Sequence, residues 1–157
     1  MQETRVANRG TPRAWIREVL RSGILAGLAM VPFAAIFRAR GLRVNEYGRK
    51  TLELVVGHVA EPAHTTLTFI QHLIISCGVA VPILLVLARV PRRRDRIWIA
   101  VAYGAGFYVV VNSLLLPFAF GDPTPWQLGF ETIYPSLFIH LVYGFVIGWI
   151  ARPPART

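Results

Sequence analysis

The sequence predicts an all-α protein: a four-helix transmembrane bundle with an amphipathic surface helix in the first outer loop. The first observation behind this prediction is composition, since 54% of the 157 residues are hydrophobic and only 16% are charged. The second is that the charged residues are confined to short stretches between long apolar runs. The third is the length of those runs, because a helix needs roughly 20 apolar residues to cross a hydrocarbon core about 30 Å thick.

The four apolar segments lie within one membrane domain, predicted to cover residues 14–151 between cytoplasmic tails at 1–13 and 152–157. The predicted spans cover residues 15–37, 65–88, 97–120 and 132–150. The first apolar run follows five arginines, and no A-x-A-like cleavage site comes after it. We therefore expect the first helix to remain in the mature protein, unlike a cleavable signal peptide.

The basic residues predict the orientation. Twelve of the 17 lie in the N-terminal tail, between the second and third spans, and after the fourth span, which four crossings place on one face. The positive-inside rule then predicts that both termini are cytoplasmic. Five basic residues in the first connection oppose this prediction: Arg38, Arg40, Arg43, Arg49 and Lys50. Because the arginines flank apolar segments, we interpret them as topology signals and contacts to anionic headgroups, and expect no nucleic-acid binding.

The first connection is too long for a plain turn and predicts an amphipathic helix from Asn45 to Val59, lying on the outer membrane surface. Asn45 is a favourable N-cap residue. The apolar residues that share one face at helical spacing are Tyr47, Leu52, Val55, Val56 and Val59.

Three polar residues, His72, Asn112 and His140, fall at a similar depth of about 10–12 Å when helix rise is counted inward from the outer ends. Polar groups inside the hydrocarbon are candidates for function. One interpretation is a site in which the two histidines bind one haem iron or relay a proton. The other is a buried hydrogen-bonded cluster that fixes the register of the helices.

Glycine spacing predicts close helix packing. Two pairs lie one turn apart, Gly23 with Gly27 and Gly144 with Gly148, and the third span contributes Gly104 and Gly106. Glycines at this spacing let a second helix backbone approach closely, either within the chain or from a partner.

A faint internal repeat is also present. Pro-Phe-Ala occurs at 32–34 and at 117–119, and His-Leu occurs at 72–73 and at 140–141. Duplication of this kind would give two helical hairpins in parallel orientation, related by an axis along the membrane normal.

The segment from His58 to His64 has the pattern H-x-x-E-x-x-H, with Glu61 at its centre. Glu61 and His64 have the spacing used by di-iron bundles, but a second copy is missing. A copper or zinc site at His58, Glu61 and His64 is one hypothesis. The alternative is a helix start, since Pro62 suits a first turn and a carboxylate there complements the helix dipole.

The last span, from His140 to Gly148, resembles the last helix of small four-helix inner-membrane proteins of unknown function such as the bacterial YagU-like group. The resemblance rests on one His, one Tyr and two Gly. It implies a bacterial inner-membrane protein and supplies no catalytic residues.

Together these patterns predict a non-catalytic membrane subunit or assembly partner of a larger complex, in contact with lipids and with other transmembrane helices. No spacing indicates a catalytic site, so we expect neither enzymatic activity nor a cofactor. The alternative is a small b-type haem protein, or one that handles a ligand or protons, using His72 and His140. A small transporter is a third hypothesis and would require a dimer.

Overall fold

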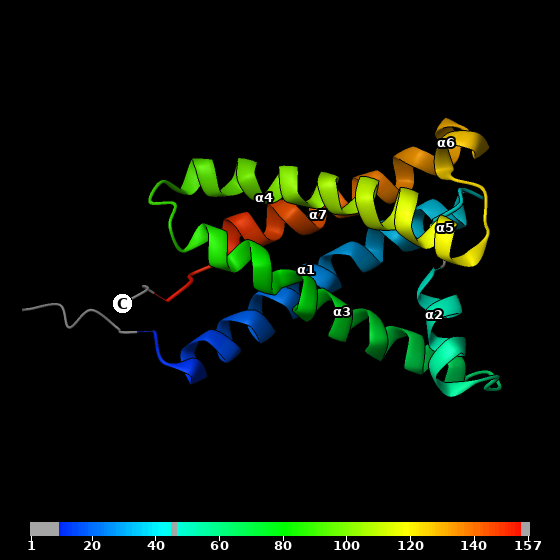
Figure 1. The fold of residues 1–157 in the computed structure, drawn as a ribbon, viewed down its shortest axis with the longest axis horizontal. Coiled ribbons are helices and arrows are strands. Elements are labelled where there is room, and N and C mark those ends of the chain that lie inside the picture. Colours follow the sequence, from blue (N-terminus) through cyan, green and yellow to red (C-terminus); the bar gives the residue numbers. More distant parts are fainter. Residues whose placement is uncertain (1–9, 45–46, 155–157) are drawn as a thin grey trace, which may run out of the picture.

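The computed structural model describes residues 10–44 and 47–154, which form helices and contain no strand. Four helical spans are long and apolar enough to cross a membrane (Figure 1). They are α1 (Pro12–Ala39), α3 (Ala63–Leu87), the continuous stretch Arg93–Phe120, and α7 (Phe130–Ile150). The all-α four-helix fold predicted from the sequence is confirmed, and the chain is a multi-pass membrane protein.

The ends of the helices follow from local chemistry. Helix α1 begins at Pro12, two residues inside the predicted tail. The hydroxyl of Thr11 caps it by accepting a hydrogen bond from the amide of Ala14 at 3.2 Å, and proline is favourable in a first turn. The helix ends just before Gly41, which has φ 74°. The third span ends at Gly121, whose φ of 64° stops the helix in the left-handed conformation.

The third span is not a uniform α-helix. Its ends are α4 (Arg93–Phe107) and α5 (Leu116–Phe120), and the residues between them, Tyr108–Leu115, form the π-helix η1. π-Helical turns inside longer helices are frequent at functional sites. Here it places the side chains of Asn112 and Ser113 in buried positions. No pattern in the sequence predicted this π-helix.

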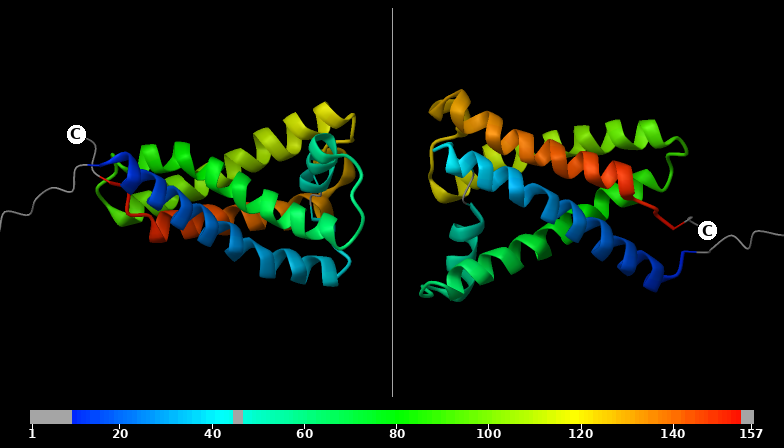
Figure 2. Two further views of the ribbon diagram at one scale, coloured as in Figure 1. Left: turned by 90° about the horizontal axis from the view of Figure 1, so that it is seen from below. Right: turned by 180° about the vertical axis from the view of Figure 1, so that it is seen from behind.

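The spans form two antiparallel hairpins, which we call hairpin one (α1 and α3) and hairpin two (α4–α5 and α7). Within each hairpin the two helices cross at an angle (Figures 1 and 2), and the contact between α4 and α7 is more extensive than that between α1 and α3. The hairpins meet through α1 and α7, while α3 and α4 diverge from their short connection and make few contacts. The core is apolar and lies where these helices meet; it includes Ala26, Ala80, Leu84, Leu87, Ala100 and Ile147.

The two ends of the bundle are formed by different segments of the chain. At one end lie the start of α1, the α3–α4 connection and the end of α7, and we call this the arginine-rich end (Figure 1). At the other, the α2 end, lie α2 (Tyr47–Val56), α5 and the short helix α6 (Pro125–Leu128).

Helix α2 is shorter than the predicted helix. Asn45, the expected N-cap, lies outside the described residues, and Gly57 with φ 72° ends the helix before Val59. Leu52 is buried, but Val55 on the same predicted face is 80% exposed. The predicted apolar face is therefore divided, because α2 packs on the bundle through one part of it and leaves the other uncovered.

Candidate functional site

Asn112 and His140 form a hydrogen-bonded pair between η1 and α7. The side-chain amide of Asn112 donates to Nε2 of His140 at 2.8 Å, and Nδ1 of His140 donates to the carbonyl of Ser136 at 2.6 Å. These two bonds define a neutral imidazole with its proton on Nδ1, since Nε2 can accept from the amide only when it is unprotonated. The rings of Phe107 and Tyr108 lie beside this imidazole, with centroids 5.9 and 5.7 Å away.

His72 does not join this pair. Its Nε2 lies 3.1 Å from the carbonyl oxygen of Gly27 on α1, to which it donates within hairpin one. Of the cluster expected of His72, Asn112 and His140, the hydrogen bond between Asn112 and His140 joins two members, while His72 bonds to α1. Each histidine bonds to the other helix of its own hairpin, although His72 still lies close enough to His140 to act on it electrostatically.

The partners of the two histidines occupy equivalent positions in the repeat. Gly27 stands five residues before Pro32, and Asn112 stands five residues before Pro117. Each hairpin thus joins the histidine of its second helix to the corresponding site on its first helix. The contact uses a backbone carbonyl in one hairpin and a side-chain amide in the other.

Five of the six glycines singled out in the sequence lie at close helix contacts. A Cβ atom at Gly23 would stand 2.6 Å from the Cα of Cys77, and one at Gly148 would stand 2.6 Å from the Cα of Ile97. A Cβ at Gly27 would stand 2.7 Å from the hydroxyl of Ser76. Gly104 and Gly144 face backbone carbonyls of the opposite helix. These five glycines therefore serve helix contacts within the chain. Gly106 is the exception, because it has open space beside it.

Two tyrosines that the sequence did not indicate as contact residues connect the hairpins. The hydroxyl of Tyr143 donates to the carbonyl of Ser76 at 2.6 Å, and the hydroxyl of Tyr103 donates to the carbonyl of Val79 at 2.9 Å. Tyr143 belongs to the motif that resembles other membrane proteins, but nothing in its spacing identified an acceptor on α3.

The pattern H-x-x-E-x-x-H does not assemble into a metal site. His58 is exposed beyond the end of α2, whereas His64 is buried, with its ring nitrogens 3.5 Å from Glu53 and 3.8 Å from Glu61. The described part of the chain holds no group of three or more His, Cys, Asp or Glu side chains placed to bind a metal. The hydroxyl of Thr65 donates to Glu61 at 2.7 Å and lowers the pKa of that carboxyl, a contact that fits the helix-start interpretation.

At the arginine-rich end, Glu18 connects α1 to the end of α7. This residue is 7% exposed, and its carboxylate accepts hydrogen bonds from Arg21, from Ser22 and from the backbone amide of Arg152, the last at 2.7 Å. Arg21 also donates to the carbonyl of Ile150 at 2.8 Å. Bonds to a charged group of this kind are stronger than neutral ones, so this contact stabilises the packing of α1 against the end of α7.

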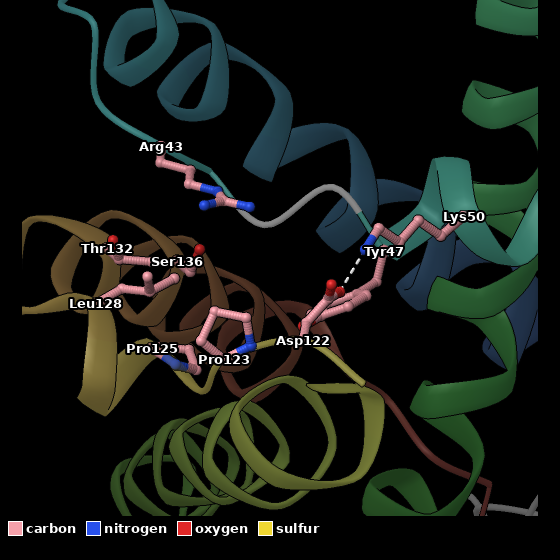
Figure 3. A pocket seen from close by; sticks show the side chains of 9 residues that line it. All are labelled: Arg43, Tyr47, Lys50, Asp122, Pro123, Pro125, Leu128, Thr132 and Ser136. Atoms are coloured by element: carbon pink, nitrogen blue, oxygen red, sulfur yellow. Dashed lines mark hydrogen bonds and ion pairs between the residues drawn. The ribbon is translucent and has the colours of Figure 1, made fainter. Parts of the chain in front are cut away.

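At the α2 end, Lys50 pairs with Asp122 across a pocket of about 70 Å³ (Figure 3). Burial and the neighbouring Asp122 raise the pKa of Tyr47, whose ring stacks on Phe120 at 5.6 Å. Ser136, whose carbonyl accepts the hydrogen bond from Nδ1 of His140, lines the same pocket. Pockets for small molecules usually measure about 300–1,000 Å³, so this one has room for a few waters and not for a cofactor.

The chain matches no family model, and the searches of curated proteins and of solved structures gave no significant match.

Proposed function

We propose that this chain is a non-catalytic membrane subunit or assembly partner, built to pack against other transmembrane helices. The observation that supports this function is that the polar groups inside the spans are used in contacts between helices. His72, His140, Tyr103 and Tyr143 each bond to a group of this bundle. Hydrogen bonds of this type fix helix register in membranes.

The two hydrogen bonds of His140 do not favour a proton relay through this residue. A relay needs a group that can accept a proton on one side and release one on the other. Nδ1 of His140 faces a backbone carbonyl and Nε2 faces an amide, and neither group passes protons onward.

The haem alternative with His72 and His140 requires both Nε2 atoms to leave their present partners. It remains a distinct hypothesis, and the absorption spectrum of the purified protein tests it. A Soret band that disappears in His72→Leu would make haem binding the better proposal.

The partner surface is proposed on α3. The glycine faces are used within the chain, whereas α3 leaves Ile70 and Ile74 exposed, 47% and 66% respectively. Since α3 and α4 contact each other little, this apolar face is open to lipid or to a partner helix.

Native mass spectrometry of the chain, extracted in mild detergent from the membrane in which it is made, tests the proposal. We expect a complex of fixed composition that is heavier than the 17.5 kDa monomer and is weakened by Ile74→Trp. The matched control is Leu25→Trp, which changes an exposed residue of α1. A monomer alone under all mild conditions would contradict a subunit role.

The proposed location is a bacterial inner membrane with both termini in the cytoplasm, supported by the excess of arginines at one end and by the resemblance of the last helix. Two of the five opposing basic residues, Arg49 and Lys50, lie in ion pairs at the α2 end. An alkaline phosphatase fused after Thr157 should be inactive and a fluorescent protein there should fluoresce. An active phosphatase would show that the C-terminus lies outside the cytoplasm and would contradict the proposed topology.

A further inference from the structure

The arginine-rich end contains a cleft of about 420 Å³ between the start of α4, the end of α7 and α1. Four arginines line it: Arg21, Arg93, Arg96 and Arg152. Arg21 is paired with Glu18, but no ion pair to a described carboxylate offsets the other three. Asp95 is the acidic residue in the first turn of α4. The cleft therefore has a clear excess of positive charge.

The side chains of Arg93 and Arg96 and the backbone of Arg152 are held in place before any ligand arrives. The guanidinium of Arg93 lies 3.8 Å from the ring centroid of Trp149 and donates to the carbonyl of that residue at 3.2 Å. Nε of Arg96 donates to the carbonyl of Val90 at 2.6 Å, and the backbone amide of Arg152 is bonded to Glu18. Side chains ordered in advance lose less entropy on binding.

Three further features favour an anionic oxygen ligand at membrane headgroup level. Guanidinium groups bind phosphate with two parallel hydrogen bonds. The N-terminus of α4 opens beside the cleft without a side-chain cap, and its dipole favours negative charge. Trp98 and Trp149 are 64% and 51% exposed at this end, as expected of tryptophans at a membrane interface.

From these observations we infer that the cleft binds the phosphate of an anionic phospholipid, with Arg93, Arg96 and Arg152 as the phosphate ligands. Pro91, Gly148 and Ile150 supply apolar walls for the glycerol region. The site is independent of the proposed partner surface on α3, which lies on another helix.

Native mass spectrometry in a neutral detergent, with lipid added at a few molecules per protein, tests the site. The wild-type protein should bind phosphatidylglycerol in preference to phosphatidylcholine. The double variant Arg93→Gln with Arg152→Gln should lose about thirtyfold in phosphatidylglycerol affinity, since each arginine near a headgroup changes binding about fivefold. The matched control Arg92→Gln with Arg94→Gln removes two exposed charges that do not line the cleft. Because neither arginine would contact the bound phosphate, the control should lose clearly less affinity than the first double variant.

Equal losses in the two double variants would overturn the inference, because lipid binding would then follow total charge. Displacement of phosphatidylglycerol by millimolar inorganic phosphate would assign the cleft to a soluble phosphate ligand, and the lipid assignment would be wrong. If circular dichroism shows that the first double variant is unfolded, the single variant Arg152→Gln replaces it as the test of the phosphate site. The bond from Arg152 to Glu18 uses the backbone amide, which this variant keeps, and a loss of about fivefold is expected.

Discussion

The two hairpins use the same elements and pack differently. In hairpin one, glycines occur at the contact on α1 only, where Gly23 and Gly27 face Cys77 and Ser76 of α3. In hairpin two, both helices contribute glycines, with Gly104 on α4 and Gly144 and Gly148 on α7. The contact between α4 and α7 is more extensive than that between α1 and α3.

The difference shows how the position of small residues sets helix geometry in a membrane. Lipid tails are as apolar as leucine, so helices associate through close van der Waals packing and hydrogen bonds. Glycines on both partners allow an extensive backbone contact, while glycines on one partner allow a smaller one. The tyrosine bonds from α4 and α7 then hold the crossing helix α3 against hairpin two.

The strongest test of this comparison is Gly104→Ala. Its Cβ would meet the carbonyl of His140, a backbone atom that cannot turn aside. We expect a loss of about 1–3 kcal/mol, typical of overpacking, in the free energy of unfolding measured in mixed detergent micelles. Gly27→Ala in hairpin one should cost less, because it meets the side-chain hydroxyl of Ser76 at a crossing that can open.

The matched control is Gly106→Ala, two residues from Gly104 on the same helix, with nothing within 4 Å of the new Cβ. It should be neutral or should stabilise the helix by up to about 1 kcal/mol. Equal destabilisation by both substitutions would show that the close contact at Gly104 does not matter.

A smaller effect is expected from the histidine contacts. Asn112→Leu removes the donor to His140. Its unfolding free energy should fall by about 0.6 to about 1.7 kcal/mol, the range for hydrogen bonds between membrane helices. His72→Leu should cost less, because its acceptor is the backbone carbonyl of Gly27. In double-mutant cycles, Asn112→Leu should couple to His140→Leu and be additive with His72→Leu. Coupling between Asn112 and His72 would support the single cluster of His72, Asn112 and His140 that the sequence predicted.

The smallest effect concerns the α2 end of hairpin one. Glu61 has a pKa below its usual 4.5, chiefly through the Thr65 hydroxyl, and it also lies 3.7 Å from Arg49. A lowered pKa gives stability that is present at neutral pH and lost as pH falls through the folded value, below 4.5. The protection factors of α2 amides, which are exchange rates corrected for the intrinsic rate at each pH, should therefore be lower at pH 3.5 than at pH 6, and Glu61→Gln should reduce the difference. An unchanged difference in that variant would exclude Glu61 as its source.

The sequence determined the four spans, because an apolar run long enough to cross the hydrocarbon has no alternative to the helix once its backbone groups must bond internally. It also identified five glycines that make close contacts, since a missing side chain is visible in the sequence itself. Both are properties of one segment at a time.

Which helix lies opposite each polar group was decided only by the tertiary structure. The sequence placed His72 and His140 at one depth, but the rotation of each helix and the crossing of α1 with α3 directed them to different partners. The π-helix η1, which carries the buried Asn112, left no sequence signal that we recognised. The arginine cleft joins α1, α4 and α7, and contacts between distant segments depend on packing angles that the order of residues along a single helix does not contain.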